Sequence, residues 1–190
     1  AYDKALATDP NLKETYLNNY LVAQYNLDKA KGAEMVNEYI AVYSKKVPIE
    51  ENMTRVGYLY NILKKKSSAD SVFALVKAKY PKGNYAFGQA ASALYAEKDM
   101  VKKEEKFNAL ITDFNLDLTK KSDAAKISPY YGVMASAFGT AKNNEKFEFY
   151  SDKIESKSNR AGAYNSFAWA SFEAKENLAF AAKISKKSLE

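Results

Sequence analysis

The chain has 190 residues, a net charge of +6, and neither cysteine nor histidine. This composition excludes disulfides, cysteine nucleophiles, histidine general bases, and metal sites built from thiolate or imidazole. Hydrophobic residues make up 47% of the chain and charged residues 27%, which is ordinary for a folded protein, while only 7 Gly and 4 Pro argue against an all-β fold.

Helical periodicity dominates the chain, and its breaks leave segments of ordinary helix length. We predict about eleven helices. Their ranges are Ala1–Thr8, Leu12–Asn26, Lys29–Lys46, Glu51–Lys66, Ala69–Tyr80, Tyr85–Glu97, Met100–Phe114, Pro129–Lys142, Asn144–Glu155, Arg160–Lys175 and Leu178–Glu190. Because most links between them are short, successive helices should pair as antiparallel hairpins.

Capping residues mark several of the predicted helix starts. The candidates are Asn11, Ser67 or Ser68, Asp99, and Ser128 directly before Pro129. The segment Asn115–Lys126 is the longest stretch without a regular pattern, and we predict a loop or an extra turn there. No Pro/Gly-rich linker divides the chain, so we expect one domain over residues 1–190.

An internal repeat with an offset of 34 residues links the stretch around Gly57 to the stretch around Ala91. Six of eight landmark pairs keep an apolar or small character, and one exception pairs Ala69 with Lys103. A hairpin needs a small residue where its two helices cross, which is the role predicted for Gly57 and Ala91. Gly57 should therefore lie against its partner helix near Ala69 or Phe73.

These landmarks resemble tetratricopeptide repeats. The matching residues are Gly57, Tyr60, Ala69, Phe73 and Pro81. The tail resembles a further unit, with Trp169 and Phe172 in its first helix, and we expect Trp169 to be packed. The resemblance implies an all-α, right-handed α-solenoid of about five antiparallel helical hairpins.

A second resemblance concerns the source of the chain. The turn Tyr80-Pro81-Lys82-Gly83 and the scarcity of arginine are similar to helical regions of exported Bacteroidetes proteins, which are often fused to a thioredoxin-like domain. This implies a periplasmic or otherwise exported location, with a cytoplasmic one as the alternative. Because both ends of the chain fall within helical patterns, we expect a fragment of a longer protein.

Charged groups give no indication of catalysis. The acidic pairs Glu50-Glu51 and Glu104-Glu105 are adjacent on single helices, so their side chains diverge and are best interpreted as solvated surface. We therefore predict a protein that is not an enzyme, with no catalytic, cofactor-binding or metal-binding residues. All basic residues except Arg55 and Arg160 are lysine, which argues against nucleic-acid binding, and no apolar stretch is long enough to span a membrane.

In tetratricopeptide repeats, ligands bind the inner surface formed by the first helices of the pairs. On this basis the candidate ligand groove consists of Tyr58, Asn61, Gln89, Ser92 and Tyr95. Thr54 and Tyr85 lie on the same projected faces, and later pairs would contribute Ser136, Ser166 and Glu173. Such a neutral, partly aromatic surface suits a peptide or a glycan better than a strongly charged ligand.

The sequence therefore predicts a non-catalytic scaffold that binds a protein or a peptide. Two alternatives remain open: a helical accessory domain of a thioredoxin-like redox protein, and an envelope protein that binds glycans or nutrients. Neither the oligomeric state nor the identity of the ligand follows from the sequence.

Overall fold

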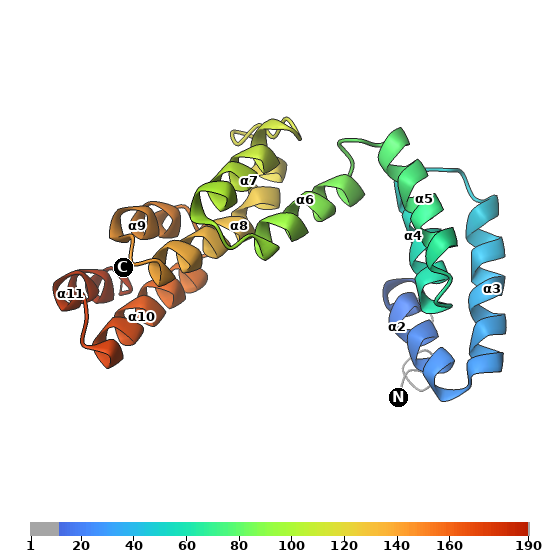
Figure 1. Cartoon of the computed structure of the whole chain (residues 1–190), viewed down its shortest axis with the longest axis horizontal. Coiled ribbons are helices and arrows are strands. Elements are labelled where there is room, and N and C mark those ends of the chain that lie inside the picture. The colour runs from blue at the N-terminus through green and yellow to red at the C-terminus, as the bar shows by residue number, and fades with distance from the viewer. Residues whose placement is uncertain (1–11, 190) are drawn as a thin grey trace. The chain divides into compact units, whose positions relative to one another are not determined.

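A computed structural model describes the backbone of residues 12–189 and the side chains of residues 16–189. This part of the chain contains ten α-helices and no β-strand, which confirms the all-α prediction (Figure 1). The helices are α2 (Leu12–Leu27), α3 (Lys29–Lys45), α4 (Glu50–Ile62), α5 (Lys66–Lys79), α6 (Asn84–Ala96), α7 (Met100–Thr112), α8 (Lys121–Thr140), α9 (Asn144–Asp152), α10 (Lys157–Ala174) and α11 (Leu178–Lys187).

Most helices that are adjacent in the sequence pack against one another. The pairs α2–α3, α4–α5, α8–α9 and α10–α11 have extensive contacts, and the first helix of a pair also contacts the first helix of the next, as α2 does with α4 and α8 does with α10. This arrangement is compatible with a helical-repeat fold. No described helix is both long enough and apolar enough to cross a membrane.

The chain divides into two compact units, residues Ala1–Ala86 and Phe87–Glu190. The first unit has a core that includes Leu21, Val36 and Leu59, and the second has a core that includes Leu94, Leu110 and Met134. The helix α6 begins in the first unit and continues into the second. The expectation of one domain over residues 1–190 stays a prediction.

Side-chain caps define four of the helix starts in the described residues. The carboxylates of Asp28 and Asp99 accept hydrogen bonds from backbone N–H groups in the first turns of α3 and α7. Asn143 and Ser156 cap α9 and α10 in the same way. The cap predicted at Asp99 is confirmed.

Two other predicted starts are wrong. The helix α5 begins at Lys66, after Lys65 and without a side-chain cap, so neither Ser67 nor Ser68 is its N-cap. The helix α8 begins at Lys121, which places Pro129 inside it and makes the end of the predicted loop helical. Burial of Ile127 anchors these early turns of α8 in the core. The helix predicted at Ala1–Thr8 and the cap at Asn11 lie outside the described residues.

The predicted packing of Gly57 is confirmed. A Cβ atom at this position would lie 2.5 Å from Cε1 of Phe73 on the partner helix, so only glycine lets the ring approach. The unmatched repeat pair, Ala69 and Lys103, also has an explanation. Both residues are buried, and the Lys103 Nζ donates a hydrogen bond of 2.9 Å to the carbonyl of Leu94 at the end of α6. A lysine is tolerated there because its ammonium group donates to carbonyls in the last turn of α6, those of Leu94 and Tyr95, where cations interact favourably with the helix end.

Candidate functional site

The five residues of the predicted ligand groove lie on two helices. Tyr58 and Asn61 are on α4 in the first unit, whereas Gln89, Ser92 and Tyr95 are on the part of α6 that belongs to the second. All five are exposed, and the tyrosines are 45% and 58% exposed. A surface shared by all five stays a prediction.

The side of α4 that bears Tyr58 borders a hollow of about 400 Å³, which Thr54 and Tyr85 also line. The ring of Phe73 stacks on Tyr85 with centroids 4.7 Å apart and meets Tyr58 edge-on at 5.3 Å. Burial raises the pKa of Tyr85, and negative charge at Tyr58 and Asp70 raises it further. Three residues projected onto the inner surface are thus brought together.

The predicted residues of α6 have local partners. The hydroxyl of Ser92 donates a hydrogen bond of 2.8 Å to the carbonyl of Gly88 in the preceding turn. The ring of Tyr95 lies 5.9 Å from that of Tyr130 on α8, centroid to centroid. Burial raises the pKa of Tyr130, and Tyr95 adds to this effect. These contacts place Tyr95 at the surface of the second unit's aromatic core.

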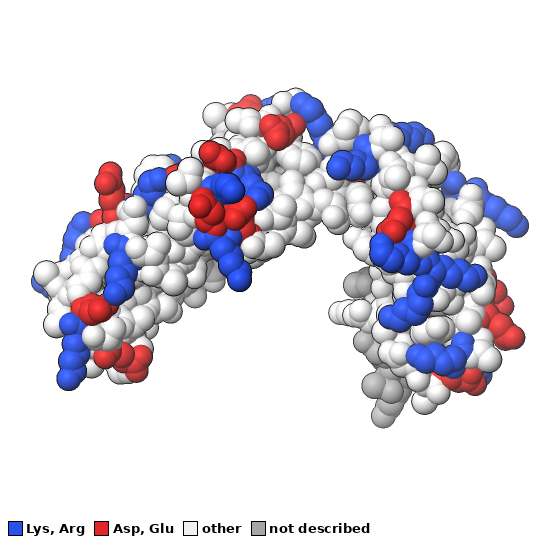
Figure 2. All heavy atoms as spheres, in the orientation of Figure 1, with Lys and Arg blue, Asp and Glu red and all other residues white. Residues whose placement is uncertain are grey.

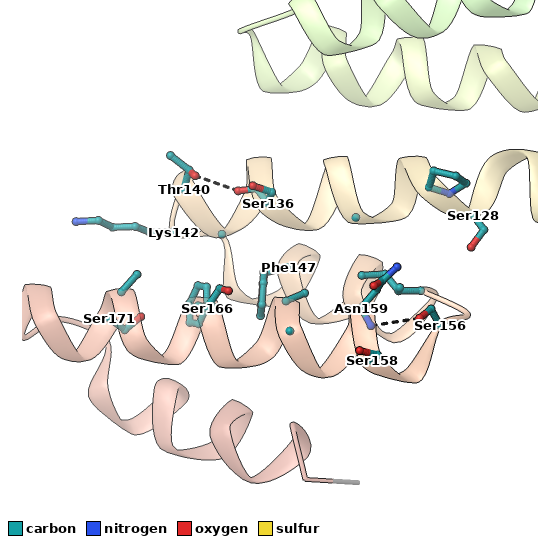
Figure 3. A pocket seen from close by; sticks show the side chains of 18 of the residues that line it. Ser128, Ser136, Thr140, Lys142, Phe147, Ser156, Ser158, Asn159, Ser166 and Ser171 are labelled. Carbon is teal, nitrogen blue, oxygen red and sulfur yellow. Dashed lines mark hydrogen bonds between the residues drawn. The ribbon is translucent and has the colours of Figure 1, made fainter. Parts of the chain in front are cut away.

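A larger groove, with a volume of about 940 Å³, lies between α8 and α10 in the second unit (Figure 3). We call it the α8–α10 groove. Its walls come from the first helices of two successive pairs, and Phe147 of α9 and Phe167 of α10 lie at its floor. Its lining includes Ala125, Ser128, Pro129, Gly132, Ser136, Gly139 and Thr140 from α8, Phe147 from α9, Ile154 from the loop that follows α9, and Ser158, Gly162, Ser166, Phe167, Ala170 and Ser171 from α10.

Small side chains at helical spacing form both walls. On α8 the spacing of Gly132, Ser136 and Gly139 places them on one face, and on α10 the same holds for Gly162, Ser166 and Ala170. Figure 3 shows the serine side chains of both helices lying along the space between them. The two walls therefore consist mainly of small side chains and hydroxyls, whereas larger apolar groups such as Phe147, Ile154 and Phe167 line the groove elsewhere.

Two of these glycines have no packing role. A Cβ atom at Gly162 would meet no atom within 4 Å, and at Gly132 it would meet only Cδ1 of Ile154, at 4.0 Å. Glycine in a helix interior costs about 0.5–1 kcal/mol relative to alanine. These two glycines therefore do not serve to bring a neighbouring helix close. They leave open space in the groove instead.

At position 139, glycine is required by packing. Its Cβ atom would lie 3.1 Å from the rings of both Phe147 and Phe167. These rings stack with centroids 4.2 Å apart, Phe147 being buried and Phe167 partly exposed. Close approach of α8 to this stack closes the apolar floor of the groove.

Pro129 disturbs the regular bonding of α8 on the groove side. Proline has no N–H, so the carbonyl of Ala125 lacks its usual helical donor, and both residues line the groove. The groove thus contains a backbone acceptor in addition to the hydroxyls of its walls. Poor helix formers are concentrated where the groove is, which is typical of functional sites.

The charged groups at one end of the groove are paired with each other. Lys142 donates a hydrogen bond to the carboxylate of Glu176, and both line the groove. Nearby, the side-chain amides of Asn144 and Asn177 exchange two hydrogen bonds, of 3.0 and 2.6 Å. This end is therefore neutral overall and rich in amide groups.

The strongest charge network of the second unit lies outside the groove lining. Lys187 on α11 bonds to Glu148 at 3.0 Å and to Asp152 at 2.8 Å, and Asp152 also accepts a hydrogen bond from Tyr164. Burial, together with the hydrogen bond to Asp152, raises the pKa of Tyr164 to about 12. The network ties α11 to α9 and α10, which is a structural role. In the described part of the chain, no group of three acidic side chains could hold a metal ion.

Trp169 is not packed as predicted. Its side chain is 61% exposed on α10, and its ring centroid lies 5.9 Å from that of Phe172, which is 64% exposed. The face of α10 toward α9 and α11 is occupied instead by Tyr164 and Ala168, both buried. Of the two small neighbours of Trp169, Ala168 is buried on that face and Ala170 lines the groove, while the indole itself remains exposed.

The inner surface that the sequence repeat predicts includes part of this groove. The repeat placed Ser136 and Ser166 on the inner surface, and both line the groove, whereas Glu173 is not among the lining residues. It missed the glycines and Pro129. Their signal was visible in the sequence: Gly132 and Gly139 are seven residues apart, two helical turns, inside an otherwise helical segment.

Comparison adds no assignment to this geometry. No known protein family, curated protein or solved structure matches the chain.

Proposed function

We propose that this chain is a non-catalytic interaction module whose second unit binds a peptide segment of a partner protein in the α8–α10 groove. The observation that carries the proposal is the groove itself, about 940 Å³ in volume, in which Gly132 and Gly162 lower helix stability without relieving a packing conflict. Gly88 on α6 is equally open but lies outside the groove lining, so it is the position of Gly132 and Gly162 on the two walls of one groove that supports a ligand there.

The chemistry of the groove suits a neutral polypeptide backbone. The hydroxyls of Ser128, Ser136 and Ser166 can donate to peptide carbonyls, and the free carbonyl of Ala125 can accept from a peptide N–H. The small side chains of the walls let a backbone approach closely, and the partly exposed ring of Phe167 gives a small apolar side chain of the ligand a surface to contact.

The same proposal includes a kinship with tetratricopeptide repeats, whose ligands bind between successive first helices. The position of the groove, between the first helices of two adjacent pairs, supports it. Export to the periplasm and association with a thioredoxin-like domain belong to this proposal only through the sequence resemblance.

A second candidate is glycan binding, which the exposed pair Trp169 and Phe172 favours. An exposed indole on a helix that also lines a hydroxyl-rich groove can stack on the apolar face of a sugar ring. The peptide takes precedence because neither Trp169 nor Phe172 is among the residues that line the groove.

The experiment is a parallel screen of peptide and glycan arrays, followed by affinity measurements on matched variants. Gly162→Met places a helix-compatible side chain in the groove. Gly88→Met is the control, because its Cβ also meets nothing within 4 Å but the residue lies outside the groove lining. Circular dichroism should show that both variants are folded.

We expect a peptide ligand that binds the wild type and the Gly88→Met variant alike and that no longer binds Gly162→Met. Binding that survives Gly162→Met contradicts the groove. Binding lost in Gly88→Met instead moves the site to the α6 surface of Gln89, Ser92 and Tyr95. A glycan ligand that is lost in Trp169→Ala overturns the peptide proposal in favour of the second candidate.

A further inference from the structure

One end of the first unit combines lysines with exposed aliphatic side chains. We call it the basic tip and define it as Lys45, Lys46, Val47, Ile49, Lys79 and Lys82. Lys45 and Lys46 end α3, Lys79 ends α5, and Val47 and Ile49 belong to the loop before α4. Figure 2 shows basic side chains along this end of the unit, where α5 leads toward α6 in Figure 1.

The tertiary structure assembles the basic tip from segments more than thirty residues apart. The carbonyl of Pro48 accepts a hydrogen bond of 3.0 Å from Lys79 Nζ and one of 2.9 Å from the hydroxyl of Tyr80. These bonds fasten the loop before α4 to the end of α5. They thereby bring the lysines that end the two helices to one place.

The charge of the basic tip has no acidic counterpart in its own segments. Neither residues 39–49 nor residues 71–83 contain Asp or Glu. Of the two acids that follow, Glu51 pairs with Arg55 at 3.5 Å, and Glu50, which accepts a hydrogen bond of 2.6 Å from the backbone N–H of Tyr85, is a single negative charge beside four lysines. The four lysines therefore produce a local positive field.

The two aliphatic side chains of the basic tip are exposed and are not packed in the core. Val47 is 71% exposed and Ile49 is 47% exposed, one on each side of Pro48. Ile49 occupies the N-cap position of α4 and makes no side-chain cap there, although a polar residue would stabilise the helix start. Two aliphatic side chains at a loop surrounded by lysines thus serve neither the core nor the helix.

We propose that the basic tip docks the first unit on an anionic membrane surface, with Val47 and Ile49 entering the headgroup region and the lysines facing lipid phosphates. A bilayer presents a diffuse negative potential, and each lysine near it contributes about 1 kcal/mol. A specific acidic protein would favour arginine, whose planar fork grips carboxylates, and the basic tip has none. Docking of this kind is peripheral, and a pair of aliphatic side chains supplements the charge.

The test is co-sedimentation of the intact chain with vesicles of phosphatidylcholine, with and without phosphatidylglycerol. We expect binding only when phosphatidylglycerol is present, and weaker binding as salt is raised. The variant Lys45→Gln/Lys46→Gln should bind roughly 30-fold more weakly, which corresponds to two lysine contributions. Val47→Ser/Ile49→Ser should also weaken binding, although the start of α4 gains a residue able to cap it.

The matched control is Lys65→Gln/Lys66→Gln, which removes the same charge from the other end of α5, where no exposed aliphatic pair is present. An equal loss of vesicle binding in the control variant would show that binding depends on net charge alone, and it would overturn the proposal. So would equal binding to both kinds of vesicle. Binding to an acidic polypeptide that is as tight as binding to vesicles, and indifferent to Val47→Ser/Ile49→Ser, would assign the basic tip to a protein partner instead.

Discussion

At the scale of single residues, glycine has two opposite uses in this protein. Gly57 is required by packing, because the ring of Phe73 occupies the space where a side chain would begin. Gly162 is not required by packing at all, because its Cβ would point into open space. The same residue type thus brings two helices together in one unit and keeps a groove open in the other.

The substitution Gly57→Leu should destabilise the protein by about 1–3 kcal/mol, because the new side chain must displace Phe73 from its stack on Tyr85. Thermal and chemical unfolding followed by circular dichroism measure this effect. Gly88→Leu is the control, since it adds the same side chain where nothing lies within 4 Å. A melting temperature unchanged in Gly57→Leu would contradict the assigned packing.

The substitution Gly162→Ala should have the opposite sign and stabilise the protein by about 0.5–1 kcal/mol. The helix gains a better helix former, and the added methyl group meets no neighbour. The measurement is the midpoint of chemical unfolding. If Gly162→Ala destabilises the chain, the glycine has a packing role, and the main support for the proposed ligand groove is lost.

At the scale of helices, α11 is held by charge as well as by its apolar face. Ala181 and Ile184 are buried, and on the same helix Lys183 and Lys187 both bond to Glu148 of α9. The hydrogen bond from Lys183, together with Lys187, lowers the pKa of Glu148 below its ordinary value of 4.5. Burial alone would raise the pKa of Asp152, but its bonds to Lys187 and Tyr164 lower it on balance.

These shifts predict that α11 loses stability in acid. A carboxyl whose pKa is lowered by folding stabilises the folded state fully above its unfolded pKa, and that stabilisation disappears as the pH falls through the folded pKa. Stability should therefore decline below roughly pH 4.5, as Glu148 and Asp152 become protonated. Lys187→Met should be less stable at neutral pH and should show a shallower decline than the wild type.

The measurement is thermal unfolding over an acidic pH series for the wild type, Lys187→Met and Lys186→Met. Lys186 is the control because it lies on the same turn of α11 and is exposed. Identical pH profiles for the wild type and Lys187→Met would show that the network does not hold the helix.

For the molecule as a whole, each of the two units has its own apolar core. The core of the first unit is built from α2, α3 and α4, and that of the second is built from α6 through α11. The proposed peptide groove belongs to the second unit and the basic tip to the first. Binding to a partner and docking on a surface would thus be carried by separately stabilised parts of one chain.

This division predicts an uneven response to local destabilisation. In Gly57→Leu, hydrogen exchange should accelerate at the amides of α4 and α5, while the amides of α8 to α10 keep their protection, because the two cores share no residue. Hydrogen exchange detected by mass spectrometry gives the comparison. Equal acceleration in both units would indicate a single cooperative core.

The helical fold, most helix bounds, the capping role of Asp99 and the contact between Gly57 and Phe73 could all be predicted from the sequence. These follow from local periodicity and from the space available where two neighbouring helices cross. The sequence did not place the start of α8, because burial of Ile127 in the core outweighs the helix-start pattern at Ser128 and Pro129. Of the α8–α10 groove it placed Ser136 and Ser166 but not the glycines or Pro129, and it located neither the basic tip nor the exposed face of Trp169. Each of these depends on which faces of distant segments meet. That is decided by the packing of whole helices, in which a glycine or a lysine has the same local pattern whether it faces a neighbour or open space.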